Sequence, residues 1–180
     1  YANADMIFTS DLPRAVARVA EHGPFLLCGR RQNLSVSEPI NFAGDWEHRL
    51  RAAVTLEGVL AIPGAIDYFA FPRLLFDAIP PFAVGRPEWD QWLLFHARVR
   101  GAAIIDATKC VLAVHQNHDY QHLTSAPPAD LDREVERNRA LALFHRLDLR
   151  DATHLLTEHG LQRALHRPHL ARRALSLPKF

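Results

Sequence analysis

Hydrophobic positions along the chain fall into short unbroken runs and into longer runs with helical spacing. Unbroken apolar runs bounded by turn or polar residues are typical of buried strands and occur at 6–8, 25–29, 103–106 and 110–114. Apolar residues recur every three or four positions, as on one face of a helix, at 14–22, 46–56 and 89–99. One more strand is predicted after the Pro63-Gly64 turn, ending near Phe71. The alternation predicts an α/β fold, with helices flanking a sheet.

The pattern changes after Pro127-Pro128. Asp130 and Asp151 can cap helices over 130–144 and 151–158, and a third helix is predicted over 160–165. We therefore divide the chain into an α/β portion at 1–126 and a helical C-terminal segment at 127–180 that packs on it. A chain of 180 residues is long enough for one substantial core.

Charge and composition exclude several classes of protein. The 21 basic and 20 acidic residues leave a formal charge of +1, so nothing favours nucleic acid as a partner. No run approaches the roughly 20 apolar residues that cross a bilayer, so we do not expect a transmembrane protein. Cys28 and Cys110 lie in apolar runs without metal-binding spacing, which favours reduced thiols and a cytoplasmic location. The chain opens within a strand pattern, so we expect an N-terminal portion to precede it.

A possible metal-binding pair stands at the front of the first strand. Asn3 and Asp5 are two positions apart, so their side chains point to the same side of an extended backbone. An amide oxygen and a carboxylate suit a hard divalent cation such as Mg²⁺ or Mn²⁺. The alternative is that the pair is an ordinary turn.

The densest group of potential ligands follows the strand at 110–114. His115, His118 and His122 surround Asp119 within eight residues, and α/β sheets place functional loops at the ends of buried strands. Imidazole binds transition metals, yet this spacing matches no closed structural zinc site. Either a functional metal site or a set of surface histidines would account for the group.

A candidate acid–base residue lies at the start of the helix over 89–99. Gly85-Arg86-Pro87 predicts a loop that enters a helix, and Asp90 then lies between Trp89 and Trp92. There it could act as a general base beside a sugar-stacking surface. The alternative for Asp90 and for Glu88 is simple stabilisation of the helix dipole, about 0.3–1 kcal/mol each.

Two arginines could bind an anionic substrate. The planar guanidinium groups of Arg73 and Arg86 match the geometry of a diphosphate or a carboxylate. The alternative is an ion pair with Asp67 or Asp77. The sequence contains no G-x-S-x-G, Walker, G-x-G-x-x-G or H-E-x-x-H motif, which argues against serine hydrolases, P-loop proteins, Rossmann oxidoreductases and zincins.

Three longer segments carry a resemblance to a known family. They read DYFAFPR at 67–73, GRPEWDQW at 85–92 and HQNHDY at 115–120. In this order they resemble the second half of bacterial family 2-like glycosyltransferases of the GT-A fold, over residues 1 to about 160. The resemblance implies a GT-A-like mixed sheet flanked by helices.

The resemblance also implies an activity and its residues. A sugar would pass from a nucleotide diphosphate sugar to a hydroxyl acceptor such as a glycan, with inversion and with Mn²⁺ or Mg²⁺. Asp5 would bind the metal together with His115 or His118, and Asp90 would be the catalytic base. We expect the substrates to contact Gly64, Asp67, Arg73, Arg86 and Trp89.

Two other functions fit the same residues. One is a non-catalytic α/β binding module in which the histidines hold a structural metal. The other is a metal-dependent hydrolase, for which Asp106 and Asp119 are the nearest further acids. Within the resemblance, Asn3 stands where the family has an acid, which weakens the expected metal site. The half that binds the nucleotide base would precede this chain, so we expect the chain alone to be inactive.

Overall fold

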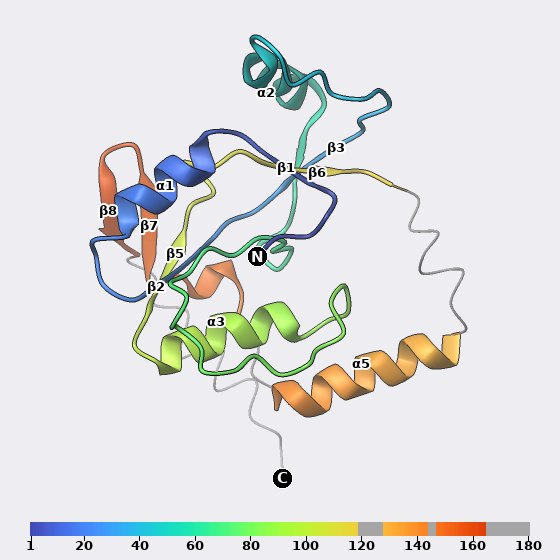
Figure 1. Cartoon of the computed structure of the whole chain (residues 1–180), viewed down its shortest axis with the longest axis vertical. Coiled ribbons are helices and arrows are strands. Elements are labelled where there is room, and N and C mark those ends of the chain that lie inside the picture. The colour runs from blue at the N-terminus through green and yellow to red at the C-terminus, as the bar shows by residue number, and fades with distance from the viewer. Residues whose placement is uncertain (119–127, 144–146, 165–180) are drawn as a thin grey trace.

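The computed structural model describes residues 1–118, 128–143 and 147–164 (Figure 1). In chain order its elements are β1 (Met6–Phe8), α1 (Asp11–Val19), β2 (Phe25–Cys28), β3 (Gln32–Leu34), α2 (Trp46–Glu57), β4 (Val59–Leu60), α3 (Trp89–Val99), β5 (Ala103–Asp106), β6 (Ala113–Gln116), α5 (Pro128–Ala142), a 3-10 turn (Leu149–Asp151), β7 (His154–Thr157) and β8 (Gly160–Arg163).

The strands form two mixed sheets. One has the order β1-β6-β3-β4, in which β6 is antiparallel to β1 and parallel to β3. The other has the order β2-β5-β7-β8, with β2, β5 and β7 parallel and β8 antiparallel. The predicted α/β class with flanking helices is confirmed, with two mixed sheets in place of the one predicted, while the GT-A fold itself stays a prediction. No helix among the described residues is long and apolar enough to cross a membrane.

The parallel pair β2–β5 forms the centre of the core. All four residues of β2 are buried, which explains why this strand is an unbroken apolar run. Leu26, Cys28 and Ile104 pack in the cluster that contains α3, whereas Leu27 and Ile105 pack in the cluster that contains α1. Because side chains alternate along a strand, α1 and α3 cover opposite faces of this pair (Figure 1).

The predicted helices over 151–158 and 160–165 are wrong. In their place β7 and β8 form a hairpin, in which Thr157 pairs with Gly160. Gly160 has a φ of 115°. A four-residue strand with only two apolar residues, Leu155 and Leu156, has no decisive period, so its partner decides the structure. Here β7 extends the parallel sheet beside β5 and buries Leu156 to 1 % exposure. Asp151 completes the capping box of the 3-10 turn, with Asp148 as its N-cap.

Other differences are smaller. The sequence did not predict β3 or β4, because neither is an apolar run of sufficient length. The strand expected from 110 begins at Ala113, since Cys110 and Val111 donate backbone hydrogen bonds to Ala107 O in a turn. Helix α5 ends at Ala142, and the predicted end of this helix at 144 lies outside the described residues.

The hairpin assignment predicts a large effect of one core substitution. Leu156→Ala should lower the free energy of unfolding by about 2–5 kcal/mol, because it opens a cavity between β7 and α1. Leu143→Ala, at a position that is 67 % exposed, should change it by less than about 0.5 kcal/mol. Urea denaturation followed by circular dichroism measures both values. Equal effects of the two substitutions would contradict the burial of Leu156.

Candidate functional site

Strand pairing brings three potential metal ligands together. Asp5 directly precedes β1, His115 lies on β6, and His118 follows β6 by two residues. In the antiparallel β1–β6 pair Met6 lies opposite His115, and the Gln116 N–H donates to Asp5 O at 3.0 Å. This register places the Asp5 side chain beside both imidazoles.

The geometry of the three groups suits a metal ion. Asp5 Oδ2 lies 3.1 Å from His115 Nε2 and 3.2 Å from His118 Nε2, and the three ligand atoms lie within 4.8 Å of one another. Two ligands about 2.1 Å from one ion are separated by about 3.0–3.4 Å at octahedral or tetrahedral angles. In addition, Asp5 Oδ1 and His115 Nδ1 are buried and have no hydrogen-bond partner among the described residues.

His115 is held in the form that binds metals. Its side chain is buried, with the residue 2 % exposed, and burial lowers the pKa of the imidazole. The positive charge of Arg31 lowers this pKa further, against smaller opposing effects of Asp5 and Asp67. A lowered pKa keeps the ring neutral at pH 7, and a neutral ring has a lone pair for a metal.

A polar network lies next to these ligands. Asp67 accepts a hydrogen bond from Asn3 Nδ2 at 2.7 Å and forms an ion pair with Arg31. Arg31 Nε also donates to Asn33 Oδ1 at 3.0 Å, and Asn33 lies opposite His115 in the β3–β6 register. Asn3 is thus engaged with Asp67, and the group that could hold a metal contains Asp5 but not Asn3.

Asp90 lies in the first turn of α3, as predicted. Glu88 precedes the helix in the left-handed conformation, with φ 85°. Burial raises the pKa of Asp90 to about 6, with smaller contributions from the charges of Asp67 and Glu88. Hydrogen bonds from the backbone N–H groups of Gln91 and Asp90 oppose this shift. The carboxylate therefore accepts hydrogen bonds within the first turn of its own helix and has a pKa close to neutral pH, where general bases are effective.

Asp67 connects the two halves of the site. Its negative charge raises the pKa of Asp90 and also the pKa of His115. A second connection runs through Tyr1, whose ring lies 4.8 Å from Trp89 and whose phenol pKa is raised by burial and by Asp67. The Asp67 carboxylate thus acts electrostatically on both Asp90 and His115.

The other predicted substrate contacts are dispersed. Gly64 lies in a turn with open space around its Cα, so no neighbour in the structure requires a glycine there. Arg73 is exposed and has no ion-pair partner among residues 1–118, 128–143 and 147–164. Trp89 is 7 % exposed and contacts Phe69 in the core, where it offers little surface for sugar stacking.

The alternative, an ion pair of Arg73 or Arg86 with Asp67 or Asp77, is also wrong. Arg86 pairs with Glu134 on α5 at 2.7 Å, so its guanidinium is already engaged. Asp67 pairs with Arg31, and Asp77 pairs with Arg100. These partners lie far apart in the sequence, so spacing could not have identified them.

The hydrolase interpretation depended on two further acids. Asp106 lies at the end of β5 and accepts hydrogen bonds from Thr108 N and Thr108 Oγ1, where it closes a turn. It does not belong to the group that could hold a metal. Asp119 and His122 lie outside the described residues.

Sequence reasoning missed Arg31, Asn33 and, on α5, Asn138. Arg31 had one available signal, since Gly29-Arg30-Arg31 follows directly on the buried strand β2, where functional loops are common. Asn33 gave none, because β3 was not predicted. Asn138 is 0 % exposed, but a single asparagine in a polar helix carries no sign of burial in the sequence.

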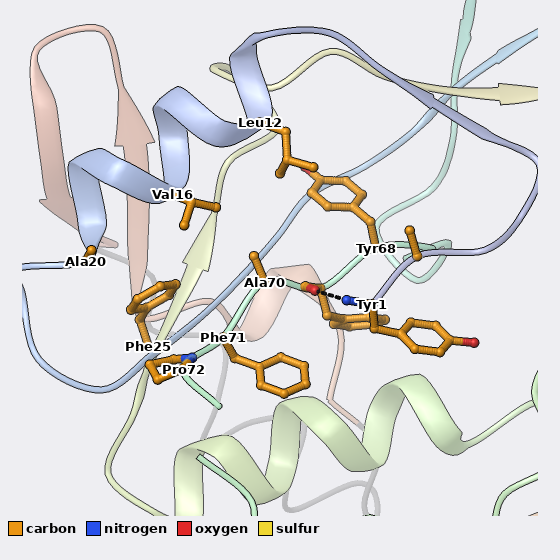
Figure 2. A pocket seen from close by; sticks show the side chains of 11 residues that line it. Tyr1, Leu12, Val16, Ala20, Phe25, Tyr68, Ala70, Phe71 and Pro72 are labelled. Atoms are coloured by element: carbon orange, nitrogen blue, oxygen red, sulfur yellow. Dashed lines mark hydrogen bonds between the residues drawn. The ribbon is translucent and has the colours of Figure 1, made fainter. Parts of the chain in front are cut away.

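A large cavity lies elsewhere (Figure 2). It measures about 640 Å³ and lies between α1 and the segment at 68–72, with Leu12 and Val16 on one side and Phe25, Ala70 and Phe71 on the other. Its lining is apolar and includes none of Asp5, Asp90, His115 or His118. The chemistry therefore does not coincide with this cavity.

No protein-family model, curated protein or solved structure matches the chain.

The raised pKa of Asp90 predicts that the stability of the folded protein depends on pH. In the folded state the Asp90 carboxyl has a pKa of about 6, against an ordinary value of 3.8. Its neutral form therefore contributes stability that is fully present below about pH 4 and is lost as the pH rises through 6. Asp90→Asn should therefore stabilise the protein by about 1–3 kcal/mol at pH 8 and by much less at pH 4. Urea unfolding at both pH values tests this, with the exposed Asp45→Asn as control. A gain that does not depend on pH would contradict the assignment.

Proposed function

We propose that this chain carries the reacting centre of a glycosyltransferase that moves a sugar from a nucleotide diphosphate sugar to a hydroxyl acceptor. The observation that carries the proposal is the convergence of Asp5 with His115 and His118, which are up to 113 positions away in the sequence. Asp90 supplies a second group of suitable chemistry, linked to the first through Asp67. These are the residues to which the resemblance assigns metal binding and base catalysis.

The ligand set bears on which metal would bind. Mg²⁺ takes oxygen ligands and keeps most of its waters, whereas transition metals accept imidazole nitrogen. Two imidazoles and one carboxylate therefore favour Mn²⁺ over Mg²⁺. A bound divalent ion would neutralise negative charge that develops on the departing diphosphate.

Asp90 would act on the acceptor. Its carboxylate takes the proton of the acceptor hydroxyl while that oxygen forms a bond to the anomeric carbon. The bond between the anomeric carbon and the phosphate oxygen breaks, and its electron pair leaves with the nucleoside diphosphate. Attack from the side opposite the leaving group inverts the configuration. A pKa of about 6 leaves Asp90 mostly ionised at pH 7 and still basic enough to accept a proton.

A structural metal site is the second candidate, because the same three ligands join the start of β1 to the end of β6. An ion there would stabilise the sheet without any chemistry. The hydrolase is less favoured, because Asp5 is the sole carboxylate of the metal-binding group within the described residues.

The proposed ligands predict saturable binding of Mn²⁺. Isothermal titration calorimetry should show one site in the unmodified chain, and His118→Ala should weaken binding at least tenfold, because one of three ligands is lost. Affinity should fall as the pH is lowered into the acidic range, since protons compete for the imidazoles.

His159→Ala is the matched control, because its side chain is 78 % exposed on the β7–β8 hairpin. Circular dichroism shows whether each variant is folded. Equal affinity of the His118 variant and the control would rule out this metal site.

The base assignment predicts a defect in turnover. In the full-length protein, Asp90→Asn should lower kcat by about 10²–10⁴-fold, because an amide cannot accept the proton. The assay measures nucleoside diphosphate released from a panel of UDP-, GDP- and dTDP-sugars with Mn²⁺. Asp130→Asn, at a side chain 53 % exposed on α5, is the control. Unchanged turnover in the Asp90 variant would refute the role, and metal binding without any release would favour the structural site.

A further inference from the structure

Helix α5 packs against the loop that leads into α3 (Figure 1). Glu134, Asn138 and Ala142 are spaced four residues apart, so they lie on one face of the helix. Ala142 is buried in the core cluster that contains α3, and Asn138 is 0 % exposed. The face of α5 toward α3 therefore combines an apolar contact with a fully buried amide.

Asn138 binds the loop backbone through three hydrogen bonds. Its Oδ1 accepts from the Ala83 N–H at 2.9 Å, and its Nδ2 donates to Ala83 O at 2.9 Å and to Pro87 O at 3.0 Å. These bonds use both donors and one lone pair of the amide. The Arg86–Glu134 ion pair adds a second connection between the same loop and α5.

The loop has a conformation that needs such support. Gly85 and Glu88 have φ angles of 81° and 85°, and for a glutamate the left-handed conformation costs roughly 1 kcal/mol or more. Glu88 is also the N-cap of α3, so its conformation sets where the helix begins. Asp90 follows two residues later. Whatever holds Pro87 and Glu88 therefore also determines the position of the Asp90 carboxylate.

We propose that Asn138 is a positioning residue for Asp90, which acts by binding the backbone at Ala83 and Pro87. It does not touch the reacting atoms. The importance of this position for catalysis rests on the function proposed above, while the positioning itself is a property of the fold. An asparagine suits the task because one side chain both accepts from and donates to a loop that has no strand partner.

Asn138→Leu tests the proposal, because it keeps the branched shape of the side chain and removes all three hydrogen bonds. In the folded variant the Ala83 amide should exchange its hydrogen at least about tenfold faster. The Asp90 carboxyl, followed by NMR titration, should move toward its ordinary pKa, since the buried environment that Asp67 and Glu88 share with it loosens. In the full-length protein kcat should fall about 10–100-fold with little change in KM.

Two further variants make the test decisive. Arg139→Ala, on the exposed face of α5, is the matched control and should leave all readouts unchanged. Glu134→Gln removes only the ion pair to Arg86 and should shift the Asp90 titration in the same direction by a smaller amount, even if Asn138→Leu does not fold. A purely structural clamp would lower overall stability and leave the Asp90 titration unchanged, and that result would overturn the proposal. Neither NMR readout requires turnover, so a failed glycosyltransferase assignment would be recognised separately.

Discussion

The antiparallel pairing of β1 with β6 is the constraint on which the candidate site depends. Side chains of a strand alternate between faces, so a slip of one residue would turn His115 away from Asp5. Two interactions with β3 prevent such a slip. Strand β3 pairs with β6 in parallel, and Asn117 donates its backbone N–H to Leu34 O at 2.9 Å. The geometry of the three ligands is thus a consequence of sheet register.

The site also contains buried carboxylates. Asp67, Asp90 and Glu88 bring negative charge into a largely buried environment, and the cost is visible in the raised pKa of Asp90. Asp67 is compensated by Arg31 and Asn3. Ionisable groups with shifted pKa values cluster at functional sites. Burial and the charge of Arg31 lower the pKa of His115. The site therefore favours a basic Asp90 carboxylate and a neutral His115 imidazole at the same pH.

Segments without regular structure depend on distant partners. The loop before α3 takes its conformation from Asn138 on α5, and Arg86 has its partner on the same helix. The hairpin β7–β8 exists because β5 offers a free edge for parallel pairing at His154 and Leu155. These interactions join residues roughly 50 positions apart, so no local pattern reveals them.

Local pattern and tertiary structure contributed different parts of this protein. Long periodic segments such as α3 and unbroken apolar runs such as β2 were predictable, because their burial imposes a period on the sequence itself. The candidate metal ligands Asp5, His115 and His118 were also predictable from side-chain chemistry. Their meeting, the ion pair of Asp67 with Arg31 and the strand at 154–157 were decided by the tertiary structure. Register and long-range pairing choose among partners that local sequence leaves equivalent.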